Sequence, residues 1–165
     1  MAKTLYLMRH AKAALPVMQY GDLDRTLNQR GLHDATEMGR KLQKRGGKPE
    51  IILCSPAQRT RQTAERLIGE FGGTMNVVQF DDRIYEASID TLLNLIRLLP
   101  EACASAMVIG HNPSIGWLAN QLSRYQIETM PSCAVASFEL PSFSWKDMGP
   151  GNTRLLDFDY PGKDL

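Results

Sequence analysis

Three short, wholly apolar runs constrain the fold of this chain more than any other feature of its sequence. They cover Leu5–Met8, Ile51–Cys54 and Ala106–Ile109, and a cluster of polar residues follows each of them. Runs of this length without polar alternation are typical of strands that are buried on both faces of a parallel sheet. We therefore expect the three runs to form the centre of a sheet whose two faces are covered by helices.

Helical patterns separate these apolar runs. Between residues 29 and 45, apolar side chains recur at the spacing of a surface helix, and two glycines follow as a stop signal. Further helices are expected after residue 55 as far as about residue 71, from 88 to 98, and after residue 112. The residues expected to cap the four helices are Asn28, Ser55, Ser88 and Asn112, and a proline follows two of them.

Three further strands are expected at Val77–Phe80, Ala134–Leu140 and Arg154–Phe158, the last two at the edge of the sheet. Strands that alternate with helices predict a single α/β domain over residues 1–165, a three-layer sandwich with a mostly parallel central sheet flanked by helices. In such sheets, ligands bind beyond the carboxyl ends of the strands.

Composition excludes several classes of function. Lys and Arg number 19 against 18 Asp and Glu, so the chain lacks the excess of positive charge expected for binding nucleic acid or an anionic membrane. No apolar run is long enough for a membrane helix or a signal peptide. The three cysteines lie in or beside apolar runs, which favours a reducing cytoplasm over a secreted disulfide framework.

Polar residues at the ends of the three central strands predict the functional site. Arg9 and His10 follow the first strand, Ser55 to Arg59 the second, and His111 the third. The carboxyl ends of parallel strands meet at one edge, and helix N-termini at that edge favour an anion. Guanidinium groups bind phosphoryl oxygens bidentately, and a neutral imidazole can attack phosphorus. These residues indicate phosphoryl chemistry that requires no metal and no cofactor.

The same segments resemble the signature sequences of a known family. Leu7–Ala11, Ser55–Ala64 and Val108–Pro113 are similar, in order, to those of the histidine phosphatase superfamily, whose members have the phosphoglycerate mutase-like fold. Asp22–Leu27 and Ile84–Ser88 resemble the branch of SixA-type phosphohistidine phosphatases. The sequence departs from the commoner pattern at Ala11, where glycine is usual; Lys12 then adds a cation beside the site.

The resemblance implies a role for each site residue. It makes His10 the nucleophile that becomes phosphohistidine, whereas Arg9, Arg59 and His111 bind the phosphoryl oxygens. Glu86 matches the position of the acid that protonates the leaving group, and Arg25 matches an arginine that reaches the phosphate or the phosphoprotein.

Structural roles compete with two of these assignments. Glu86 could be a capping or solvated carboxylate near a helix start, and Arg25 could pair with Asp22 or Asp24. A cysteine phosphatase would require five residues between its cysteine and its arginine, but only four separate Cys54 from Arg59.

The expected function is hydrolysis of protein phosphohistidine through a phospho-His10 intermediate, in cytoplasmic signalling. The expected partner is a phosphoprotein, such as a phosphohistidine carrier domain, or a small phosphorylated metabolite. Two alternatives stay open at this point. The first is a small-molecule phosphatase or mutase of the same superfamily, and the second is a catalytically silent phosphoprotein-binding module.

Overall fold

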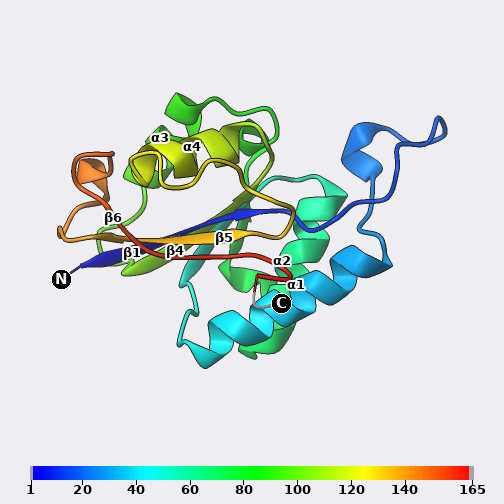
Figure 1. The fold of residues 1–165 in the computed structure, drawn as a ribbon, viewed down its shortest axis with the longest axis horizontal. Coiled ribbons are helices and arrows are strands. Elements are labelled where there is room, and N and C mark those ends of the chain that lie inside the picture. The colour runs from blue at the N-terminus through cyan, green and yellow to red at the C-terminus, as the bar shows by residue number, and fades with distance from the viewer. Residues whose placement is uncertain (1, 164–165) are drawn as a thin grey trace.

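The computed structural model describes residues 2–163 and contains one six-stranded sheet with helices on both faces (Figure 1). The order of strands across the sheet is β3-β2-β4-β1-β5-β6. The strands are β1 (Lys3–Arg9), β2 (Ile51–Cys54), β3 (Val78–Phe80), β4 (Ser105–Gly110), β5 (Val135–Leu140) and β6 (Arg154–Asp159). The α-helices of the described residues are α1 (Gln29–Lys44), α2 (Gln58–Phe71), α3 (Ile89–Arg97) and α4 (Ser114–Leu122).

The sheet is mixed, with its parallel part at the centre. β1 pairs with β4, and β2 pairs with both β3 and β4, in parallel register. β5 runs antiparallel to β1, and β6 runs antiparallel to β5, so the last two strands extend one side of the sheet. The prediction of a mostly parallel α/β sandwich is confirmed, and so is the expected place of the C-terminal strands at the edge.

The helices form two layers, with α3 and α4 over one face of the sheet and α1 and α2 over the other (Figure 1). Each face has its own hydrophobic core, and successive residues of β1 enter opposite cores. Leu7 packs in the core beside α3 and α4, and Met8 packs in the core beside α1 and α2. Because side chains alternate between the faces of a strand, burial on both faces explains why the run Leu5–Met8 is apolar throughout.

Two helices begin later than the sequence predicts. α2 begins at Gln58 rather than Pro56, and α4 begins at Ser114 rather than Pro113; neither helix has a side-chain cap. The expected caps make other contacts: Ser55 contacts His111 across the sheet edge, and Asn112 donates to a main-chain carbonyl. The other two expected caps are confirmed, since Asn28 accepts from an amide in the first turn of α1 and Ser88 does the same in α3.

Residues 12–28, which we call the arm, project beyond the carboxyl end of β1 before the chain enters α1 (Figure 1). The arm carries a short 3₁₀ helix, η1 (Asp22–Asp24). Its base is closed by a bridge between Ala13 and Leu27 and by a bond from the Asn28 amide to the Lys12 carbonyl. A Cβ atom at Gly31 would lie 2.1 Å from that carbonyl oxygen, so this close approach requires glycine.

None of the helices within residues 2–163 is long and apolar enough to cross a membrane.

Candidate active site

The carboxyl ends of the central strands bring the predicted polar clusters to one edge of the sheet. Arg9 lies opposite Gly110 in the parallel pairing of β1 with β4, so the next residues, His10 and His111, leave the sheet side by side. Their ring centroids lie 5.2 Å apart. Ser55 leaves β2 on the other side of β4, and its Oγ atom lies 2.7 Å from Nε2 of His111.

His10 is a buried imidazole with a fixed tautomer. Its Nδ1 atom lies 2.7 Å from the main-chain oxygen of Ala11. Because a carbonyl can only accept a hydrogen bond, Nδ1 carries the proton and Nε2 keeps a free lone pair. Burial, followed by the charges of Arg59 and Arg9, lowers the pKa of His10 to about 4, although the bond to Ala11 acts in the opposite direction. His10 is therefore neutral at pH 7.

His111 is also buried and neutral. Burial, followed by the neighbouring His10 ring and the charge of Arg59, lowers the pKa of His111 to about 3. The Tyr85 and His111 rings pack in a T-shaped arrangement, with the two centroids 5.5 Å apart. The Nδ1 atom of His111 is buried and has no hydrogen-bond partner among the described residues. The Ser55 hydroxyl can donate to Nε2, which would leave the ring proton on Nδ1.

Arg9 is held by the loop between α4 and β5. Its Nη1 atom donates to the main-chain oxygen of Met130 at 3.2 Å, and the Asn112 amide donates to the same oxygen at 3.0 Å. The Nε atom of Arg9 is buried and has no hydrogen-bond partner in the part of the chain that the structure describes. Since buried polar atoms are rarely left unsatisfied, Arg9 Nε and His111 Nδ1 are candidate donors to a ligand.

Arg59 enters the site from the first turn of α2. Its side chain is 7% exposed, and its Nη1 and Nη2 atoms donate to the main-chain oxygen and the carboxylate of Asp22 at 2.7 and 2.9 Å. Thr63 ties this turn to the end of β1, because its hydroxyl donates to the Arg59 carbonyl and accepts from the Ala11 amide. The helix that supplies Arg59 is thus fixed to the strand end that supplies His10.

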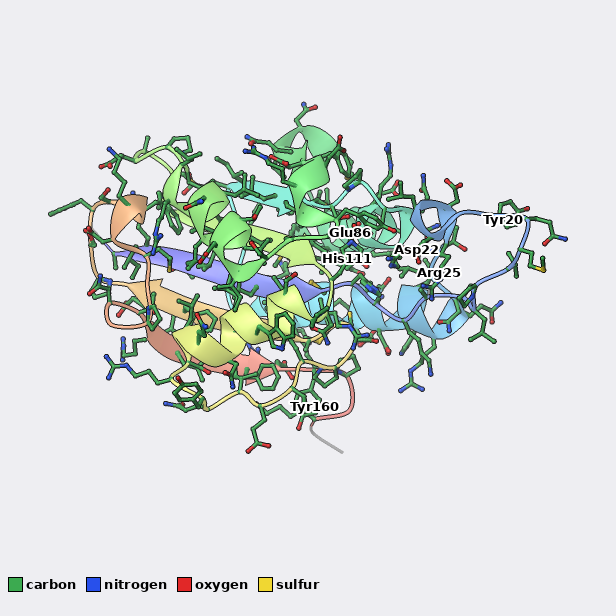
Figure 2. The ribbon with its side chains drawn as sticks, turned by 90° about the horizontal axis from the view of Figure 1, so that it is seen from above. Tyr20, Asp22, Arg25, Glu86, His111 and Tyr160 are labelled. Carbon is green, nitrogen blue, oxygen red and sulfur yellow. The ribbon has the colours of Figure 1, made fainter. Side chains whose placement is uncertain are left out.

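Arg25 reaches the same region from the arm. Its Nη1 atom donates to Asp22 at 3.1 Å, and its Nε and Nη2 atoms donate to the carbonyl of Ala14 at 3.2 and 3.1 Å. The structural pairing of Arg25 with Asp22 that the sequence left open is therefore present. Figure 2 shows Asp22, Arg25 and His111 grouped at one end of the sheet, whereas Tyr20 lies farther out on the arm.

Glu86 and Lys12 are exposed at the edge of this group. Within residues 2–163, neither side chain makes a hydrogen bond or an ion pair. Ser88 caps α3, so of the two structural alternatives for Glu86, capping is wrong and an exposed carboxylate is what the structure contains. Glu86 follows Tyr85, whose ring contacts His111, and Figure 2 shows it at the same end of the sheet.

The structure provides no support for cysteine chemistry at this edge. Burial raises the pKa of Cys54 to about 12, so its sulfur is a thiol rather than a nucleophilic thiolate. Among the described residues, no group of three or more His, Cys, Asp or Glu side chains is arranged to hold a metal ion.

Four groups contribute to the site in roles that the sequence did not predict. Ser55 is interpreted there as a helix cap and Asp22 only as a partner of Arg25, yet both contact predicted site residues directly. Tyr85 lies beside Glu86 in a segment that the resemblance covers, which was a usable signal. The Met130 carbonyl carries no sequence signal, because any residue at this position would supply the same main-chain oxygen.

The sequence profile of the histidine phosphatase superfamily (branch 1) matches residues 5–95 of the chain. The phosphohistidine phosphatase SixA of Escherichia coli K12 is 28% identical over 162 residues, which are 92% of this chain and 96% of the E. coli protein.

Solved structures extend the likeness over the whole fold. A candidate phosphohistidine phosphatase SixA from Agrobacterium tumefaciens superposes with a TM-score of 0.82 at 29% identity, over 97% of this chain and 99% of that one. The mycobacterial glucosyl-3-phosphoglycerate phosphatase Rv2419c superposes with a TM-score of 0.63 at 16% identity, over 94% of this chain and 97% of that one. The second likeness is one of fold alone.

Proposed function

We propose that this chain, which belongs to the histidine phosphatase superfamily and resembles its SixA-type members, hydrolyses phosphohistidine in proteins through a phospho-His10 intermediate. The observation that carries the proposal is a neutral imidazole inside a group of arginines. Two buried donor atoms in this group, Arg9 Nε and His111 Nδ1, lack partners among the described residues. A phosphoryl group supplies the acceptor oxygens that these two atoms need.

In the first step, Nε2 of His10 forms a bond to phosphorus while the P–N bond of the substrate phosphohistidine breaks. The lone pair on Nε2 is supported by the bond from Nδ1 to the Ala11 carbonyl and by the lowered pKa of His10. The leaving imidazole takes a proton from Glu86 or from bulk water. Arg9, Arg59 and His111 donate to the oxygens on which negative charge is spread in the transition state.

In the second step, a water molecule attacks phosphorus, the bond between phosphorus and Nε2 breaks, and inorganic phosphate leaves. Glu86 or bulk water accepts the proton that the attacking water loses. Because guanidinium groups stabilise the phosphoryl charge in both steps, we propose that the reaction requires no metal ion.

The choice of a protein substrate rests on the relatives. The E. coli relative, similar over nearly all of both chains, is a phosphohistidine phosphatase. A phosphohistidine carrier domain is therefore the substrate we would try first, in a cytoplasmic signalling pathway.

The second candidate is hydrolysis of a small phosphorylated metabolite, which the fold shared with glucosyl-3-phosphoglycerate phosphatase favours. A mutase would use the same intermediate but return the phosphoryl group to the product. A silent phosphoprotein-binding module would keep the anion site without turnover.

One experiment separates hydrolysis of phosphohistidine, hydrolysis of a small molecule and binding without turnover. The protein is mixed with a phosphohistidine carrier domain or with an aryl phosphate, both in the presence of a strong chelator. The reaction is quenched at alkaline pH, and mass spectrometry follows the His10 peptide while phosphate release is measured. We expect a transient phosphoryl group on His10 and faster turnover of the phosphohistidine domain.

Faster turnover of the aryl phosphate would keep the mechanism and move the substrate to small molecules. Absence of both adduct and phosphate release would reject the enzymatic proposal and leave a binding module. Activity that returns only when a divalent ion is restored would reject the metal-independent mechanism.

A further inference from the structure

The carboxylate of Asp22 collects donors from three separate segments of the chain. Arg59 in α2 donates to Oδ2 at 2.9 Å, Arg25 at the end of η1 donates to Oδ1 at 3.1 Å, and the Tyr85 hydroxyl donates to Oδ2. The hydrogen bond from Tyr85, followed by those from Arg25 and Arg59, holds the pKa of Asp22 well below its usual range. Asp22 is therefore a carboxylate at every pH at which the protein would work.

The contact with Arg59 fixes the direction of its guanidinium group. Nη1 is held by the main-chain oxygen of Asp22 and Nη2 by the carboxylate, so both ends of the planar fork contact one residue. A guanidinium group has five N–H donors, and these two bonds leave three for other acceptors. Asp22 thus orients Arg59 without exhausting its capacity to bind a phosphoryl group.

Tyr85 connects the same carboxylate to the histidine pair. Its hydroxyl donates to Asp22 while its ring forms a T-shaped contact with His111. On the opposite side, Arg25 is held between Asp22 and the carbonyl of Ala14. One exposed carboxylate therefore joins the arm to α2 and to the segment that packs against His111.

We propose that Asp22 is a positioning residue, whose carboxylate holds Arg59, Arg25 and Tyr85 in the arrangement that stabilises the phosphoryl transition state. This inference rests on the proposed function, because it assigns Asp22 a role in that reaction. A charged donor that is out of place loses more interaction energy in the transition state, where bond order and charge change, than in the ground state. Removal of Asp22 therefore acts chiefly on kcat.

A carboxylate beside an anion site also has an opposite effect, because its negative charge repels a phosphoryl dianion. If repulsion dominated, removal of the charge would strengthen oxyanion binding and raise kcat/KM. Positioning predicts the reverse sign for both quantities. The direction of change therefore distinguishes the two roles.

The test compares Asp22→Ala, Asp22→Asn and the control Asp24→Asn. Asp24 lies in the same 3₁₀ helix, and no side-chain bond from it to Arg59, Arg25 or Tyr85 exists among the described residues. The measurements are kcat and KM with the phosphorylated substrate, the inhibition constant of orthovanadate as a probe of the transition state, and thermal unfolding.

We expect Asp22→Ala to lower kcat by about 10–100-fold with KM within about threefold, and to weaken vanadate inhibition in parallel. Asp22→Asn keeps one acceptor oxygen of the same shape, so its loss should be smaller, at about 3–10-fold. Asp24→Asn should match the wild type, and all three variants should unfold at about the wild-type temperature.

Equal kcat values for Asp22→Ala and Asp24→Asn would overturn the proposal, and so would a rise in KM with kcat unchanged. Stronger vanadate binding by both Asp22 variants would show that Asp22 is only a competing anion. A wild type that binds vanadate without turnover would reject the proposed function, while vanadate affinity would still test Asp22. A wild type that does neither would overturn both.

Discussion

The candidate site has two walls. The inner wall consists of His10, Ser55 and His111 at the strand ends, with Arg59 beside them in the first turn of α2, whereas the outer wall consists of Asp22 and Arg25 on the arm. His10, Ser55 and His111 on the inner wall are all buried, at 9% exposure or less. Asp22 on the arm has a side chain that is 47% exposed. Side chains at the ends of packed strands are held by the sheet itself, but those on an exposed arm depend on a few polar contacts. We infer that the inner wall supplies the reacting atoms, whereas the outer wall orients the side chains around them.

The largest expected effect comes from the inner wall. His10→Ala removes the only lone pair that we assign to attack on phosphorus, so we expect kcat to fall by about 10⁴-fold or more. The fold should survive, because a smaller neutral residue replaces a neutral one. The control is His33→Ala, an exposed histidine on α1. Near-normal turnover by His10→Ala, measured as phosphate release, would remove His10 as the nucleophile.

A smaller loss is expected when the inner wall keeps its histidines but loses the group that orients one of them. Ser55→Ala deletes the hydroxyl 2.7 Å from Nε2 of His111 and frees the ring to change tautomer. We expect kcat/KM to fall by about 10–100-fold. Ser114→Ala is the matched control, because among the described residues that buried hydroxyl hydrogen-bonds only to the main-chain oxygen of His111. Equal losses in the two variants would show that packing rather than the ring contact matters.

The inner wall was also the part that the sequence predicted best. Leu5–Met8 and Ile51–Cys54 are apolar because both of their faces are buried, and this pattern is readable without a structure. The starts of α2 and α4 were predicted too early, since a polar residue before a proline looks the same whether it caps a helix or contacts another strand end. Ser55 does the latter.

The outer wall was harder to predict because its contacts join distant parts of the chain. Asp22 lies 37 residues from Arg59 and 63 residues from Tyr85. No local periodicity encodes such pairs. Pairing of Arg25 with Asp22 or Asp24 could be named from the sequence as an alternative to phosphate binding because the residues lie within a single turn, and the structure contains the pair with Asp22.

Replacement of Arg25 tests whether residues of the outer wall contribute less to kcat/KM than residues of the inner wall. Three nitrogen atoms of its guanidinium group already bind Ala14 and Asp22, so fewer donors remain for a phosphoryl group. We expect Arg25→Ala to lower kcat/KM by about 3–10-fold, compared with about 100-fold or more for the buried Arg59→Ala. The measurement is steady-state hydrolysis of the same phosphoprotein by both variants. A larger loss for Arg25→Ala would contradict the assignment of the outer wall to orientation.

The smallest expected effect is the dependence of kcat/KM on pH, which should originate in His10 of the inner wall. The pKa of His10 is lowered from 6.5 to about 4, so the protonated, non-nucleophilic form dominates only below about pH 4. We expect the ring resonances of His10 and kcat/KM to change little between pH 8 and pH 5, since kcat/KM reports groups of the free enzyme. An acid limb with an apparent pKa near 6.5 would mean that His10 is solvated and that the inner wall is open to water.

Asp22 cannot produce such a limb, because its pKa is lowered and it stays charged across this range. Titration of wild type and Asp22→Asn should therefore give the same acid limb, even though their kcat values differ.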